Sequence, residues 1–231
     1  MSQYSDRPQF DLSAIYRETR LRLLDLAPAL SDKQLSTVTP TCPDWTVKDV
    51  FAHLTGLASE VTRGRLEELG SSERTAAQVN SRKDFTIEKV CEEWRFLGDS
   101  VDELIVEARR ALTPLVVDAW THEQDLSNAA GVQSGREGSG LFLTMNVVWR
   151  LKGKIRQAGI PSLRVISGRV DWVIGDTDPA AVLRLSEYEM ARAFMARRSI
   201  DQLRSYSWEG DPEPYLPLIP YFEPPLYEIV E

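Results

Sequence analysis

The chain has 231 residues, and 27 Lys and Arg stand against 35 Asp and Glu, which gives a formal net charge of −8 at pH 7. This acidic balance, without a basic stripe, argues against the phosphate backbone of a nucleic acid as a partner. Residues 1–10 lack the apolar segment of a signal peptide, and no apolar run approaches the ~20 residues that span a bilayer. We therefore expect a cytoplasmic protein without a membrane or nucleic-acid partner.

Four stretches in the first 130 residues carry apolar side chains at three- and four-residue steps, which predicts amphipathic helices. They span residues 12–27, 47–57, 87–105 and 114–130. Thr46 and Thr86 can cap the second and third helices, with Asp49 placed to complete a capping box. Pro114 suits the first turn of the fourth helix, and Gly131 suits its end. Four such helices predict a bundle.

The segments between these helices are expected to be less regular. Residues 31–43 form a connection, with a short turn through Leu35 that Ser31 or Asp32 can cap. Residues 64–84 are polar and charged, which is typical of an exposed excursion. A fifth helix, closing at Gly159, is expected over 141–159 and is assigned to the first domain.

After Pro161 the apolar period falls from about four to two, which predicts strands. A hairpin is expected to turn near 167–168, followed by a strand at 181–185 and a helix at 187–198. From Ser205 onward the chain is rich in Pro and acidic residues, so an irregular tail on the surface is expected. The predicted fold class is α+β, with a helical bundle at 1–158 and a small mixed α/β domain at 159–231.

The sequence contains only two histidines, and both fall in predicted helices. Asp118 and His122 are four residues apart, so their side chains share one helix face. His53 lies in the second helix between apolar residues. Two interpretations stay open: a hydrogen-bonded core histidine with a separate Asp–His salt bridge, or one divalent-metal site built from His53, Asp118 and His122.

The other polar residues near these histidines have ordinary interpretations. Glu123 and Asp125 are solvent-facing acids by default, although either could support a ligand indirectly. Trp45 is expected to anchor the core. Cys42 and Cys91 are far apart in sequence and without a neighbouring histidine, which favours two reduced thiols and leaves the site without an obvious protein nucleophile.

Two motifs carry a resemblance to a known family. They read Thr-Cys-Pro-Asp44-Trp45-Thr-Val-Lys-Asp-Val-Phe-Ala-His53-Leu and Asp118-x-x-x-His122-Glu-x-Asp125-Leu-x-x-Ala-x-Gly131. Together they resemble the mycothiol-dependent maleylpyruvate isomerase family of actinobacteria, which belongs to the wider DinB-like metal-binding four-helix bundles. Weaker matches are similar to the sterol-carrier-protein-like C-terminal module of that family, at Trp172-Val-Ile-Gly, Arg197-Arg198-Ser-Ile-Asp-Gln-Leu and Trp208-Glu-Gly-Asp211-Pro.

The resemblance implies a metal, most often zinc, held by His53, Asp118 and His122. It also implies mycothiol as the thiol cofactor, whose thiolate would add to a maleylpyruvate-like acid and permit cis/trans isomerisation. Arg197, Arg198 or Arg150 would bind the carboxylates of that substrate. One departure is that the family carries glutamate where this chain has Asp118, so the carboxylate reaches less far.

Other functions remain compatible with the sequence. A thiol S-transferase would use the same metal and thiol but leave the thiol on its product. A metal-bound hydroxide would make the protein a hydrolase. A non-catalytic divalent-metal-binding bundle, or a plain bundle without metal, would need no substrate at all. The expected partners are a small-molecule thiol and a small electrophilic or dicarboxylic acid, and the protein could be a monomer or a homodimer.

Overall fold

The structure is a computed structural model, and it describes residues 10–67, 70–133, 136, 138–168 and 170–231. The chain forms two compact units, residues 1–135 and 136–231. The first is helical and the second contains a four-stranded sheet, as the α+β class predicted. In the described ranges, no helix combines the length and the apolar character that crossing a membrane requires.

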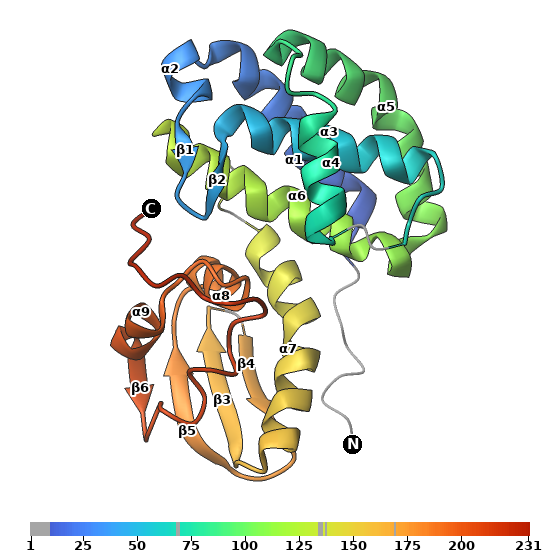
Figure 1. Ribbon diagram of the computed structural model, residues 1–231. Coiled ribbons are helices and arrows are strands. Elements are labelled where there is room, and N and C mark those ends of the chain that lie inside the picture. Colours follow the sequence, from blue (N-terminus) through green and yellow to red (C-terminus); the bar gives the residue numbers. More distant parts are fainter. Residues whose placement is uncertain (1–9, 68–69, 134–135, 137, 169) are drawn as a thin grey trace. The chain divides into compact units, whose positions relative to one another are not determined.

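Four long helices build the N-terminal unit (Figure 1), and they confirm the predicted bundle. These are α1 (Leu12–Leu26), α3 (Val47–Thr62), α5 (Ile87–Glu107) and α6 (Arg109–Ala130). Helix α3 packs against α5, and α1 packs against both α5 and α6. Trp94 and Trp120 are fully buried between them, and the indole N–H of Trp94 donates to the Tyr16 hydroxyl at 3.0 Å.

The start of α6 differs from the prediction. The helix begins at Arg109, directly after Ala108 breaks α5 at φ −112° and ψ 36°, and Pro114 lies inside it. A proline in the second turn removes one backbone hydrogen bond but leaves the downstream helix intact. The predicted end is confirmed, because Gly131 adopts φ 69° and its N–H bonds back to Asn128 and Ser127.

Short elements connect the four helices: η1 (Ala27–Ala29), α2 (Asp32–Leu35), β1 (Val38–Thr39), β2 (Cys42–Thr46) and α4 (Ser72–Asn80). The strands β1 and β2 form a small antiparallel hairpin. Helix α4 lies in the segment expected to be exposed, yet Gln78 and Val79 are buried. Gly56 allows this approach, because a Cβ there would lie 2.5 Å from the Cβ of Gln78.

The C-terminal unit is a sheet with helices, and its strand order is β4-β3-β5-β6. The elements are α7 (Ser139–Ala158), β3 (Ser162–Ser167), β4 (Val170–Ile174), β5 (Pro179–Arg184), α8 (Glu187–Phe194), α9 (Ile200–Ser205) and β6 (Ser207–Glu209). The predicted hairpin is confirmed, with Ser167 opposite Val170. Strand β5 runs parallel to β3, and β6 closes the other edge antiparallel to β5.

Helix α7 belongs to the C-terminal unit, which differs from the predicted bundle domain at 1–158. Its residues Val148, Leu151 and Ile155 are buried in one cluster with the β3 residues Leu163 and Val165. An amphipathic helix lies with the surface that buries its apolar face, and here that surface is the sheet. The division between the units therefore falls at 135/136.

The tail after Ser205 is irregular beyond β6, as expected, but it does not only cover the surface. Tyr215, Leu216 and Ile219 are at most 2% exposed and belong to the core of the C-terminal unit. Tyr215 also donates through its hydroxyl to the carbonyl of Pro161 at 3.1 Å. This part of the tail therefore completes the core, because its apolar residues fill the space next to the sheet.

A buried ion cluster joins α1 to α5 in the N-terminal unit. Asp102 accepts from Arg17 Nε at 2.7 Å and from Arg20 Nη2 at 3.0 Å, and Arg20 is 4% exposed. The Arg20 guanidinium fits because Gly98 has no side chain: a Cβ there would lie 2.0 Å from Nη1 of Arg20. Gly98 is therefore required for this ion pair.

We expect Gly98→Ala to destabilise the protein by about 3 kcal/mol, because displacing Arg20 leaves Asp102 with part of its charge unpaired in the core. Thermal and denaturant unfolding followed by circular dichroism measures this. Gly153→Ala is the control, since a Cβ at this exposed position of α7 meets no described atom within 4 Å. That control should gain roughly 0.5–1 kcal/mol. A Gly98→Ala protein as stable as the parent would contradict the prediction.

Candidate metal centre

The first histidine is positioned by the cap of α3. Thr46 Oγ1 accepts the Asp49 N–H at 3.2 Å, and Asp49 Oδ2 accepts the Thr46 N–H at 2.9 Å, so the predicted capping box is present. This fixes where the helix begins and hence which face carries His53, two turns later. His53 is 3% exposed, in the interior of the N-terminal unit.

The structure brings His53, Asp118 and His122 together. His53 Nε2 lies 3.2 Å from Asp118 Oδ2, and His122 Nε2 lies 3.6 Å from Asp118 Oδ1. One donor atom from each residue lies within 4.8 Å of the other two. Both imidazoles are buried, while the Asp118 side chain is 36% exposed. The group is therefore closed on the histidine side and accessible on the carboxylate side.

These separations suit a metal ion. With zinc–nitrogen and zinc–oxygen bonds of about 2.0–2.2 Å, neighbouring ligand atoms of a tetrahedral site lie about 3.3–3.6 Å apart. The two Nε2–Oδ separations fall close to this interval. Imidazole nitrogen and carboxylate oxygen are ligands that zinc and several other divalent metals accept.

Gln78 on α4 determines the proton position on His53. Its amide nitrogen donates to Glu60 Oε2 at 2.6 Å, so its carbonyl oxygen is the atom that faces His53 Nδ1, at 2.7 Å. An oxygen acceptor there requires a proton on Nδ1. In the neutral ring Nε2 then carries a lone pair, directed at an Asp118 oxygen, and two facing acceptors need a cation between them. The residues present therefore fit a metal ion.

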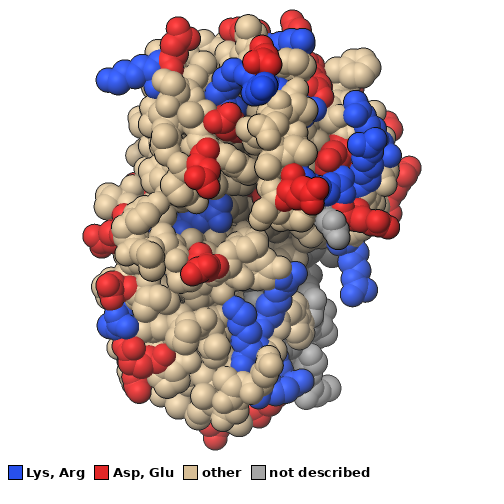
Figure 2. All heavy atoms as spheres, viewed as in Figure 1, with Lys and Arg blue, Asp and Glu red and all other residues tan. Residues whose placement is uncertain are grey.

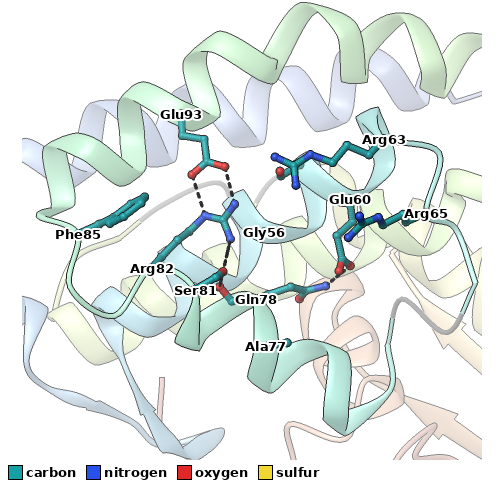
Figure 3. Close-up of a pocket in the computed structure, with 11 residues that line it drawn as sticks. Gly56, Glu60, Arg63, Arg65, Ala77, Gln78, Ser81, Arg82, Phe85 and Glu93 are labelled. Carbon is teal, nitrogen blue, oxygen red and sulfur yellow. Dashed lines mark hydrogen bonds and ion pairs between the residues drawn. The ribbon is translucent and has the colours of Figure 1, made fainter.

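Gln78 also lines a pocket of about 380 Å³, together with Gly56 and Glu60 (Figure 3). Its partner Glu60 is held by Arg74 Nη2 at 3.0 Å. Sequence reasoning missed Gln78, because it lies in the polar segment 64–84. The available signal was Gly56 inside an otherwise apolar helix, which often marks the close approach of another element.

Trp45 lies beside both imidazoles. Its ring centroid is 5.0 Å from that of His53 and 6.3 Å from that of His122. The two imidazole rings are 5.3 Å apart, edge to face. Trp45 is half-buried, so its ring forms one wall of the centre and reduces access of water to the ligands.

Glu123 and Asp125 are buried, in contrast to their expected solvent-facing positions. Glu123 accepts a bidentate pair from Arg22, at 2.6 and 2.9 Å, which joins α6 to α1. Asp125 Oδ2 lies 3.1 Å from His122 Nδ1. Cys42 on β2 is close to the same pair, with donor atoms of Cys42, His122 and Asp125 all within 4.8 Å of one another. No residue next to Cys42 in the sequence is a histidine, and the hairpin and α6 meet only through the fold.

The arginines predicted to bind substrate carboxylates lie in the C-terminal unit, outside the unit that holds the histidines. Arg198 donates to both carboxylate oxygens of Glu189 at 2.8 Å, to Glu231 and to the carbonyl of Arg197. Arg197 donates to the carbonyl of Met195. The Arg150 guanidinium lies 4.1 Å from the Tyr221 ring centroid. Arg198 is thus already paired with protein carboxylates.

The N-terminal unit is thus a helical bundle in which two histidines and one carboxylate converge. Residues 16–123 match the family model described as the mycothiol maleylpyruvate isomerase N-terminal domain. The N-terminal unit therefore belongs to this family, whereas the similarity of the C-terminal unit to a sterol-carrier protein stays a prediction. No curated protein and no solved structure matched the chain.

We expect Gln78→Leu to weaken divalent-metal binding by about 10- to 100-fold, because His53 loses the acceptor that keeps its proton on Nδ1. Metal affinity is measured by competition with a chromophoric chelator. Asn80→Leu, an exposed substitution on the same helix, is the control and should bind metal like the parent. Equal affinities for the two variants would show that Gln78 has no role in orienting His53.

Proposed function

We propose that His53, Asp118 and His122 hold one divalent metal ion and that the protein is a thiol-dependent enzyme of the maleylpyruvate isomerase type. The observation that carries this proposal is the convergence of these three side chains, with Gln78 directing the His53 lone pair at the same point. The family match of the N-terminal unit supports mycothiol as the thiol. Zinc is the expected metal, because two imidazoles and one carboxylate form a common catalytic set for it.

Three protein ligands leave a coordination position for a small molecule. A divalent cation there lowers the pKa of a thiol that binds it and so supplies a thiolate near neutral pH. The chain's own residues direct the approach: both histidines are buried, Trp45 forms one wall, and the Asp118 side is exposed. A thiol would enter from the carboxylate side and displace water there.

The reaction that fits this arrangement begins with the thiol's addition to an electrophilic carbon of a small unsaturated acid. In an isomerisation, the thiolate adds to the double bond, the new single bond rotates, and elimination returns the thiolate with the double bond in its other geometry. In an S-transfer, the carbon–sulfur bond stays, the carbanion formed by the addition takes up the proton that the thiol released, and the thiol leaves with the product. Cys91 does not supply this thiolate, because it is buried and desolvation raises its pKa to about 11.

The first expected outcome concerns metal content. His53→Ala, His122→Ala and Asp118→Asn should each lower the bound divalent metal from about one ion per chain to a small fraction, because every ligand contributes to the affinity. Elemental analysis of dialysed protein measures it. Asp44→Asn is the control, an exposed acid in the hairpin beside the centre. Unchanged metal content in both histidine variants would exclude this centre.

The second expected outcome concerns the thiol. Metal-loaded protein is incubated with mycothiol and a panel of small unsaturated acids, and both acid and free thiol are followed. Isomerisation converts the acid without net loss of thiol, S-transfer consumes one thiol per acid, and omitting the thiol stops either reaction. Cys91→Ala should keep full activity as a control. Turnover of a substrate without any thiol would contradict the proposal and point to a hydrolase.

A further inference from the structure

His122 presents its two ring nitrogens to two different sets of residues. Nε2 faces Asp118 at 3.6 Å, on the side of His53. Nδ1 lies on the other edge of the ring, 3.1 Å from Asp125 Oδ2. Cys42, Asp125 and a ring nitrogen of His122 have donor atoms within 4.8 Å of one another. The proposed metal centre uses only the first edge of the ring, so the second edge requires its own explanation.

The Nδ1 edge of the His122 ring is buried, and its nitrogen lacks a hydrogen bond within the described part of the chain. His122 is 5% exposed, Asp125 is 1% exposed, and the side chain of Asp125 has no solvent contact. The geometry at Nδ1 is close but misaligned, and Nδ1 makes no hydrogen bond to any described residue. A buried ring nitrogen without a hydrogen bond, next to a buried carboxylate, is costly. A cation between them removes this cost.

Cys42 supplies the third donor and defines the chemistry. It lies at the start of β2 and is half-buried, so small ions can reach it. The Thr41 hydroxyl approaches its sulfur at 4.0 Å and can donate to it, which favours an electron-rich sulfur. One sulfur, one imidazole nitrogen and one carboxylate oxygen within 4.8 Å of one another form a set that thiophilic divalent ions prefer.

We propose that Cys42, Asp125 and Nδ1 of His122 form a second cation position, which takes a thiophilic divalent ion such as Cd²⁺ or Zn²⁺. It shares His122 with the proposed metal centre, and in that respect it rests on the proposed function. A neutral imidazole has one lone pair, so an ion at either position requires the proton of His122 on the opposite nitrogen. The two positions are therefore alternatives for a single ion.

The test is a titration of metal-free protein with Cd²⁺, followed by thiolate-to-cadmium charge-transfer absorption in the ultraviolet. One equivalent should produce the band. Cys42→Ser should abolish it, whereas Cys91→Ser, the same substitution at the buried cysteine of α5, should retain it. Asp125→Asn should weaken Cd²⁺ binding by about tenfold or more, as the loss of a ligand charge does.

His53→Ala separates this inference from the proposed function. The variant should retain the Cd²⁺ band, because His53 is not part of the second position. It should lose affinity for divalent metals that prefer nitrogen and oxygen ligands to sulfur. A missing band in the parent protein, a band that survives Cys42→Ser, or a band that disappears in His53→Ala would overturn the second position. If the band behaves as expected but His53→Ala changes no metal's binding, the proposed centre fails and the second position stands.

A readout on unsubstituted protein guards against misfolding of a variant. Mass spectrometry after brief alkylation should find Cys42 modified in metal-free protein and protected by one equivalent of Cd²⁺. Cys91 should stay unmodified in both samples, because it is 3% exposed and desolvation raises its pKa. Equal modification of Cys42 with and without Cd²⁺ would also overturn the second position.

Discussion

Two buried imidazoles directed at one carboxylate are the constraint on which the N-terminal unit depends. Gln78 fixes the proton of His53 on Nδ1, so Nε2 has only its lone pair to offer Asp118 Oδ2 at 3.2 Å. Two acceptors at that distance repel each other unless a proton or a metal ion lies between them. The surrounding helices keep the three side chains in place, and the free energy that holds this arrangement comes from the packed core rather than from the polar groups themselves.

A surface helix therefore controls the orientation of a buried ligand. Helix α4 reaches α3 because Gly56 leaves space, and this contact delivers Gln78 to His53. The Gln78 amide nitrogen donates to Glu60 (Figure 3), and Glu60 in turn forms an ion pair with Arg74. Acidic and basic side chains are interspersed over the visible face of the N-terminal unit (Figure 2).

What could be predicted from the sequence was local. The capping box at Thr46, the i,i+4 spacing of Asp118 and His122, and the end of α6 at Gly131 depend on residues within one or two turns. Local sequence patterns could not identify Gln78 and Cys42. These two residues come close to the histidines only because α4 and the β1–β2 hairpin pack against the long helices. The same limit explains α7: its apolar stripe predicts a partner surface but does not say which one.

The two proposed ion positions, on the Nε2 edge and on the Nδ1 edge of His122, differ in the net charge of the ion together with its ligands. A divalent ion held by two neutral imidazoles and Asp118 would leave a net charge of +1, which would attract an anion such as a thiolate or a carboxylate. With a Cys42 thiolate, Asp125 and one imidazole the sum is zero, so an ion there gains little from an anionic ligand. Arg198, in the C-terminal unit, is paired with Glu189 and with Glu231, whose side chain is 1% exposed. With a metal ion in the proposed centre, an anionic ligand would therefore be favoured on the Asp118 side of His122, where the Asp118 side chain is 36% exposed.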